Sequence, residues 1–181
     1  MNIVIADDAE LLEHVYKLRH QVLCEEKRIP GFTNENDSQI EQDEFDTHSR
    51  HLLLEHGGKY IGTARIILPS CSEWLVEKYI DDMNVIVDRN TTCEISRFMI
   101  ISAAQKLPNL TPTLMQGVLQ LSRMHNIEHW VCFMSPALNR LLSRYGMQFN
   151  QVSECYDVHG MRAAHYISIA DMLSRDNCIL Q

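Results

Sequence analysis

Hydrophobic residues along the chain recur at two spacings, one typical of helices and the other typical of strands. Between residues 11 and 23 the apolar side chains lie three or four positions apart, as on one face of a helix. Asp7 or Asp8 can cap this helix, because a carboxylate there accepts hydrogen bonds from the free N–H groups of the first turn, and Pro30-Gly31 ends it. The same criteria predict two more helices, from Pro112 to about His125 and from Pro136 to Tyr145.

Strand-like segments lie between and around these helices. They are predicted at Asn2–Ala6, Arg50–Glu55, Lys59–Leu68, 91–101, His129–Met134, Phe149–Asp157 and Met161–Ile169. Two of them are joined by His56-Gly57-Gly58, which favours a hairpin, and residues 33–50 are polar and predicted to form a loop. We find no internal repeat and no linker. The pattern therefore predicts one domain over residues 1–181, with helices and strands built around one sheet.

The charge balance narrows the classes of function. The chain has 16 basic and 24 acidic residues, which gives a net charge of −8. A general nucleic-acid binder needs a basic face, and so does a protein held at an anionic membrane, so neither partner is expected. The apolar runs are too short for membrane insertion, and the N-terminal residues do not resemble a signal peptide. With six cysteines and no C-x-x-C pair, the chain is expected to be cytoplasmic and to bind no metal.

Three charges interrupt segments that otherwise look like buried strands. Arg65 lies within Gly62–Leu68, and Glu94 and Arg97 lie within Cys93–Ile100. A buried charge costs several kcal/mol unless it is paired, so each must have a partner or face a polar cleft. Strand alternation places Glu94, Ser96 and Phe98 on one face of the sheet and Arg97 on the other, unless a bulge intervenes.

Arg19 is a further misplaced cation, on the apolar side of the first helix, and Asp43 and Asp46 are candidate partners for the arginines. Two interpretations remain open. The charges form an ion-pair network that fastens a loop to the sheet, or they line a cleft that binds a charged small molecule, with Glu94 as a proton acceptor.

These residues stand in an order that resembles the acyl-homoserine-lactone synthases, also called autoinducer synthases, a branch of the GNAT-like acyltransferase fold. The resemblance covers about Tyr16 to Ile169. Its motifs are Arg19 with Leu23, Asp43-Glu44-Phe45-Asp46, the run Gly62–Pro69, Cys93-Glu94-Ile95-Ser96-Arg97-Phe98, and the run Met134–Leu142. The resemblance implies an α+β fold in which helices flank a mixed, largely antiparallel sheet on both faces.

The resemblance also implies a reaction. Members of this family transfer a fatty acyl group from acyl carrier protein to the amine of S-adenosylmethionine. The acylated product then closes to a lactone and releases methylthioadenosine, and the lactone serves as a quorum-sensing signal. S-adenosylmethionine would be a co-substrate, and no permanently bound cofactor is implied. Glu94, Ser96 and Arg97 would act in catalysis, and the small amine acceptor would be bound by Arg19, Asp43, Asp46, Arg65 and Phe98. Neighbouring arginines are expected to keep Glu94 ionised and lower its basicity.

The absence of glycine from the segment Ser102–Asn109 indicates which acyl donor to expect. GNAT enzymes that use coenzyme A present a glycine-rich loop to its pyrophosphate, whereas Ser102–Asn109 contains no glycine. This favours acyl carrier protein as the donor. A carrier protein is acidic, so an exposed basic dock is expected, for which Arg140 and Arg144 are the first candidates, with Arg123 and Lys106.

Three departures from the family keep other functions open. Leu23, Ile29 and Cys93 stand where the family has aromatic residues that line the substrate pocket, and Phe32 is a candidate substitute. The related N-acyl amino acid synthases acylate an amino acid or another small amine on the same scaffold, and this is the main alternative. A non-catalytic, GNAT-like binding module is the other.

The acidic excess is concentrated in one stretch of the chain. Residues 35–46 contain six acidic residues and no lysine or arginine, and the rest of the chain has 16 basic and 18 acidic residues. Because the stretch includes Asp43 and Asp46, it predicts a local negative field that favours a cationic substrate.

Overall fold

The strands of the protein form one mixed sheet. The computed structural model describes residues 1–32, 39–83, 85 and 87–181, and within these the strand order is β1-β2-β3-β4-β5-β8-β6, with β7 paired to β8. The strands are β1 (Asn2–Ala6), β2 (Ser49–His56), β3 (Lys59–Ile67), β4 (Thr92–Ile100), β5 (His129–Met134), β6 (Asn150–Gln151), β7 (Tyr156–Asp157) and β8 (Met161–Ser168).

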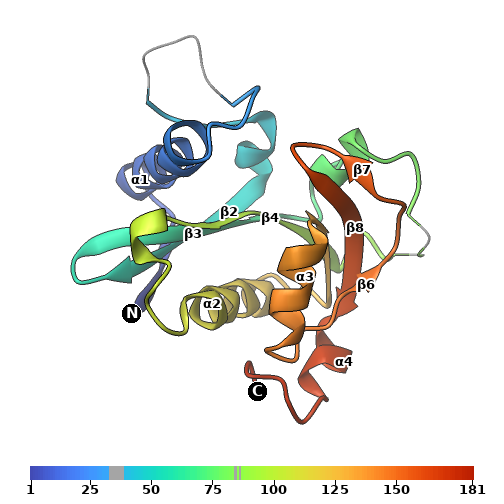
Figure 1. Ribbon diagram of the computed structural model, residues 1–181. Helices are drawn as coiled ribbons and strands as arrows, with labels where there is room; N and C mark the ends of the chain where they lie inside the picture. Colours follow the sequence, from blue (N-terminus) through green and yellow to red (C-terminus); the bar gives the residue numbers. More distant parts are fainter. Residues whose placement is uncertain (33–38, 84, 86) are drawn as a thin grey trace.

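Helices cover both faces of this sheet, as Figure 1 shows. The helices are α1 (Ala9–His20), α2 (Leu110–Met124), α3 (Pro136–Ser143) and α4 (Ile169–Leu173), with a π-helical turn at Gln21–Glu26 and 3₁₀ turns at Glu44–His48, Leu75–Lys78 and Ser102–Ala104. Helix α1 packs on one face through Val15 and Leu18, whereas α2 and α3 bury Leu114, Val118 and Leu142 against the other. The predicted α+β, three-layer fold is therefore confirmed.

The parallel pairing of β4 with β5 divides the sheet into two halves. Strands β4 and β5 are paired only from Thr92 opposite His129 to Glu94 opposite Val131, although both strands continue beyond these residues. The other pairs are antiparallel over the described residues. Glu94 thus lies at the last paired position, where the two strands begin to separate.

A bulge in β4 follows directly. Thr63 faces Met99 and Arg65 faces Ser96, so two residues of β4, Arg97 and Phe98, stand opposite one residue of β3. Arg97 takes the left-handed conformation, with φ of 49°, which costs a non-glycine residue about 1 kcal/mol or more. The bulge corrects the prediction from strand alternation, because Arg97 shares the α1 face of the sheet with Ser96, and Phe98 packs on the α2 side.

Two predicted elements differ in extent from the structure. The strand predicted at Phe149–Asp157 is two short strands, β6 and β7. Between them, Ser153 uses its side-chain hydroxyl to accept a hydrogen bond from the backbone N–H of Ala164, which interrupts the regular ladder. The first helix loses its α-helical pattern after His20 and continues as the π-helical turn to Glu26.

The remaining strands and caps lie close to their predicted positions. Gly57 and Gly58 form the turn between β2 and β3 with positive φ angles, Asp8 caps α1, and Ser135 caps α3. Among the described residues, none of the helices has the length and apolar character that a membrane crossing requires.

Candidate active site

A buried network of three arginines and three carboxylates joins α1, β3 and β4 to the segment 41–46. Asp46 accepts hydrogen bonds from Arg19 and Arg65, each at 2.6 Å. Glu41 bonds Arg19 at 2.5 Å and Arg97 at 2.8 Å. Asp43 completes the network, because Arg65 binds one of its oxygens at 2.5 Å and Arg97 the other at 2.8 Å.

The network is almost completely removed from solvent. Arg19 and Arg65 are 0% exposed, and Asp46 is 6% exposed. Burial by itself would raise the pKa values of Glu41 and Asp46, but the hydrogen bonds from the arginines outweigh it and hold both below their usual range. Their contribution to stability is therefore present at neutral pH and is lost as the pH falls below about 4.

These contacts bear on the two interpretations of the misplaced charges. Arg19, Asp43, Asp46 and Arg65 converge as expected, but their partners are one another. Neither Asp43 nor Asp46 lines the cavity described below. Asp43 caps the 3₁₀ turn that contains Asp46, and the capping box that the two residues form fixes their positions. Glu35 and Asp37, from the same acidic stretch, lie outside the described residues.

Glu94 is separate from this network. Its Oε2 accepts a hydrogen bond from the backbone N–H of Val76 at 3.0 Å, and its Oε1 is buried with no partner among the described residues. Burial raises the pKa of Glu94 to about 7, against smaller opposing effects of the Val76 N–H and of Arg65. The expectation that nearby arginines give Glu94 a low pKa is therefore wrong in its net result, because Arg65 and Arg97 lower the pKa by less than burial raises it.

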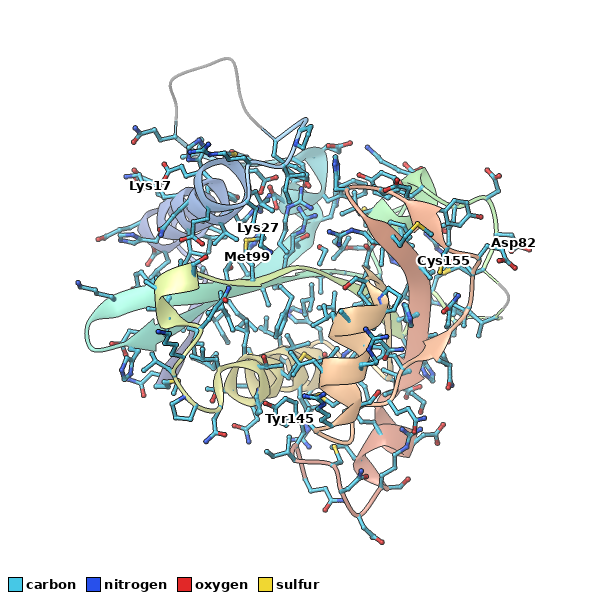
Figure 2. All side chains as sticks on the ribbon, in the orientation of Figure 1. Lys17, Lys27, Asp82, Met99, Tyr145 and Cys155 are labelled. Carbon is cyan, nitrogen blue, oxygen red and sulfur yellow. The ribbon has the colours of Figure 1, made fainter. Side chains whose placement is uncertain are left out.

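Glu94 borders a cavity of about 170 Å³ that opens where β4 and β5 separate. On the α1 side of the sheet its walls include Phe32, Tyr79, Phe133 and Arg162. On the other side its walls are apolar and come from β5, α2, α3 and the residue before β6, namely Met134, Met115, Leu138, Leu142 and Phe149. The cavity thus runs from a polar end, past a carboxylate, into an apolar end. Figure 2 shows two of its residues, Lys27 and Met99, on the α1 side of the sheet.

The other expected site residues take different places. Ser96, Arg97 and Phe98 all line the cavity, although Ser96 accepts a hydrogen bond from Arg65 and Arg97 is bound to Glu41 and Asp43. Leu23 and Ile29 also line it, with Phe32, whose ring lies 5.0 Å from the Arg97 guanidinium. Cys93 is instead buried in the core with α2.

The expected carrier-protein dock lies on the outer surface. Arg140 is on α3 and Arg144 caps its C-terminal end, and both are exposed. Neither forms an ion pair with another described residue, in contrast to the arginines of the network.

Three residues of the site are not evident from the sequence pattern. Glu41 stands out there only as part of an acidic stretch, yet in the structure it binds two arginines. Tyr79 gave no indication of its place in the cavity. Arg162 could have been found by the criterion that identified Arg65, because it is a charge at the start of a predicted strand with buried alanines after it. Across the parts of the chain that are described, no three His, Cys, Asp or Glu side chains gather as a metal site would require.

Known structures with similar folds are acyltransferases of the GNAT-like type. BjaI, a CoA-dependent acyl-homoserine lactone synthase solved with SAM and isopentyl-CoA, is 18% identical with a TM-score of 0.78, over 94% of this chain and 84% of its own. TofI, solved with an inhibitor and MTA, is 17% identical with a TM-score of 0.77, over 98% of both chains. An acyl-CoA N-acyltransferase from Pseudomonas aeruginosa is 21% identical with a TM-score of 0.60, over 92% and 97%.

The sequence itself identifies the family within this fold. Residues 14–168 match the family described as N-acyl amino acid synthase FeeM. The chain therefore belongs to this family and is an acyltransferase. Among curated proteins, none matches the sequence significantly.

The buried network gives a prediction about stability. Replacing Asp46 with Asn removes the charge that faces both Arg19 and Arg65, and should lower the free energy of unfolding by about 3–5 kcal/mol. Urea unfolding at pH 7 measures this change. Glu44→Gln is the matched control, because Glu44 is an exposed carboxylate of the same segment paired with Lys78, and it should cost less than about 1 kcal/mol. An Asp46→Asn protein as stable as the control would contradict the role assigned to the network.

Proposed function

We propose that the protein joins a fatty acyl group, delivered as a thioester, to the α-amine of an amino acid. The observation that carries this proposal is Glu94, a buried carboxylate with a pKa of about 7 between the polar and the apolar ends of one cavity. An amine acceptor reaches the cavity as an ammonium, which is not a nucleophile. A carboxylate that exchanges a proton near neutral pH is suited to remove that proton.

The reaction requires one proton transfer before the new bond forms. The acceptor ammonium gives a proton to Glu94, directly or through one water molecule, and the amine then attacks the thioester carbonyl carbon. A C–N bond forms, the C–S bond breaks, and the thiol leaves with a proton. Oε1 of Glu94 is suited to meet the ammonium, since it has no partner in the described part of the chain. A backbone N–H near Phe98, past the last β4–β5 pair, is suited to polarise the carbonyl.

The apolar end of the cavity is suited to the acyl chain. Met115, Leu138, Leu142 and Phe149 offer it a surface without charges, so burying a fatty chain there removes apolar area from water. Met115 and Leu142 are themselves part of the hydrophobic core, which fixes the shape of this end.

The nature of the acceptor is supported by two observations. The family match is to N-acyl amino acid synthases, and Leu23 and Ile29 line the cavity where the autoinducer synthases have aromatic residues. S-adenosylmethionine, with lactone formation, is the second candidate acceptor. It is supported by the similarity in fold to BjaI, which was solved with SAM, and to TofI, which was solved with MTA.

Acyl carrier protein is proposed as the donor. The segment between β4 and α2 has no glycine with which to cradle a pyrophosphate. Arg140 and Arg144 present positive charge at α3 that pairs with no other residue in the described ranges. Coenzyme A thioesters are the alternative, since BjaI and MesI are described as CoA-dependent.

An assay with both acceptors tests the reaction. The protein is incubated with a dodecanoyl thioester of acyl carrier protein and either the common amino acids or S-adenosylmethionine, and products are identified by mass spectrometry. We expect an N-dodecanoyl amino acid. A lactone together with methylthioadenosine would establish the second candidate instead, and no turnover of carrier-protein or CoA thioesters would refute both.

The role of Glu94 predicts a defined kinetic change. Glu94→Gln should lower kcat by about 10²–10⁴-fold, because the amine loses its proton acceptor. In the unmodified protein kcat/KM should rise with pH through about 7, as Glu94 becomes ionised, and this inflection should vanish in the variant. Because burial raises the pKa of Glu94, its ionised carboxylate destabilises the folded protein at pH values above the pKa that Glu94 has in the unfolded chain. At pH 8, Glu94→Gln should therefore unfold no more easily than the original protein. Full activity of this variant would remove Glu94 from the mechanism.

If acyl carrier protein is the donor, the charges of Arg140 and Arg144 should affect KM for that donor alone. Reversing Arg140 and Arg144 to Glu should raise KM for the carrier-protein thioester about tenfold, and more at low salt, because the partner is acidic. KM for an acyl-pantetheine thioester, which has no protein part, should not change. Lys59→Glu, an exposed cation in the β2–β3 hairpin, is the control. Equal effects on the two donors would contradict a dock at α3.

A further inference from the structure

Three strong cations border the cavity, and their surroundings differ. Arg97 is already bound to Glu41 and Asp43. Lys27 is exposed, at the end of the π-helical turn. Arg162 is half-buried and borders the same cavity as Glu94. Of the three, Arg162 alone is partly buried and forms no ion pair with a carboxylate of the described residues.

The position of Arg162 is set by the β5–β8 pairing. Met134, the last residue of β5, faces Ala163, so Arg162 stands one residue beyond the end of that strand. Alternation along β8 places Arg162 on the same face as Ala164, which packs with Val131 and Val76 on the α1 side of the sheet. Glu94 faces the same side, because it is paired beside Val131 and bonds the backbone of Val76. Arg162 and Glu94 therefore share one face of the sheet, on opposite sides of the opening between β4 and β5.

The guanidinium of Arg162 has donors to spare. Its Nε donates to the backbone carbonyl of Val158 at 2.9 Å, which fixes the side chain in place. No described carboxylate pairs with its two Nη groups. Burial lowers the pKa of Arg162, and the positive charge of Arg97 acts in the same direction. An anion that enters the cavity would relieve this unfavourable environment, and the two Nη groups form the planar fork that binds a carboxylate by two hydrogen bonds.

We propose that Arg162 binds the α-carboxylate of the acceptor while Glu94 receives the proton of its α-ammonium. This inference rests on the proposed function. It makes Arg162 a specificity-determining residue, because an amine or an amide lacks the carboxylate and would leave the guanidinium unpaired. The pair also suits either candidate acceptor, since amino acids and S-adenosylmethionine both bear an ammonium and a carboxylate on one carbon.

Product binding tests the inference without requiring turnover. The probes are N-dodecanoylglycine and N-dodecanoylglycinamide, which differ in the carboxylate alone and have no amino-acid side chain that could clash. Calorimetric titration of the protein should show the acid binding at least about tenfold more tightly than the amide, as expected for a hydrogen-bonded charge pair. In Arg162→Gln this preference should fall to about one, whereas Lys27→Gln should retain it.

Each outcome separates the inference from the function on which it rests. If the unmodified protein binds acid and amide equally, or if Arg162→Gln retains the preference, the inference is overturned and the acylation function stands. If Lys27→Gln loses the preference, the carboxylate belongs to Lys27. If neither probe binds, the acyl amino acid function fails, and the inference fails with it.

A second variant guards against misfolding of the first. Arg162→Lys keeps the positive charge but not the planar fork, so it should retain part of the preference, and thermal unfolding shows whether each variant is folded. In the acylation assay, Arg162→Gln should raise KM for the amino acid about tenfold or more and leave KM for the thioester unchanged. A purely structural role would weaken both.

Discussion

The cost of burying charge governs the arrangement of this site. Arg19 and Arg65 are 0% exposed and the side chain of Arg97 is 11% exposed, and such groups are tolerated only when each is paired and hydrogen-bonded. Glu41, Asp43 and Asp46 pair with them, and this fastens the segment before β2 to α1, β3 and β4. The pairing also leaves Glu94, among the described residues, without an arginine bound directly to it. Burial raises the pKa of this fourth carboxylate to about 7, and the more distant charges of Arg65 and Arg97 offset only part of that rise.

The bulge in β4 and the separation of β4 from β5 create the cavity beside these charged residues. Arg97 reaches Glu41 and Asp43 because the bulge turns it to the α1 side, and the same extra residue places Phe98 on the α2 side. Beyond Glu94 the two strands are unpaired, so the cavity passes through the sheet there. A proton acceptor at the last paired residue therefore lies between a polar chamber and an apolar one. This placement suits the proposed joining of an amine to a fatty acyl group.

Much of the fold follows from local patterns, and the parts that do not are long-range. The strand His129–Met134 and the caps Asp8 and Ser135 were predictable because burial and capping depend on neighbouring residues. The positive φ of Arg97 was not, since an arginine gives no local reason for a bulge. Nor was the choice of partners within the network. The sequence shows which charges must be satisfied, but distances across the fold decide that Asp43 and Asp46 bind arginines rather than line the cavity.

The pairing of these acidic residues with arginines also changes the charge expected of the substrate. The acidic stretch 35–46 suggested a negative field suited to a cation, yet its three described network members are matched by three arginines. Among the described residues, the cavity itself is bordered by one carboxylate, Glu94, and by Lys27, Arg97 and Arg162. Such a lining matches a ligand with separate positive and negative ends. In the described part of the chain it contains no second carboxylate that could pair with the sulfonium of S-adenosylmethionine. An amino acid meets both conditions, because its ammonium and carboxylate lie on one carbon and its net charge is zero. The electrostatics of the cavity thus support the amino-acid acceptor proposed above, which agrees with the description of the matched family.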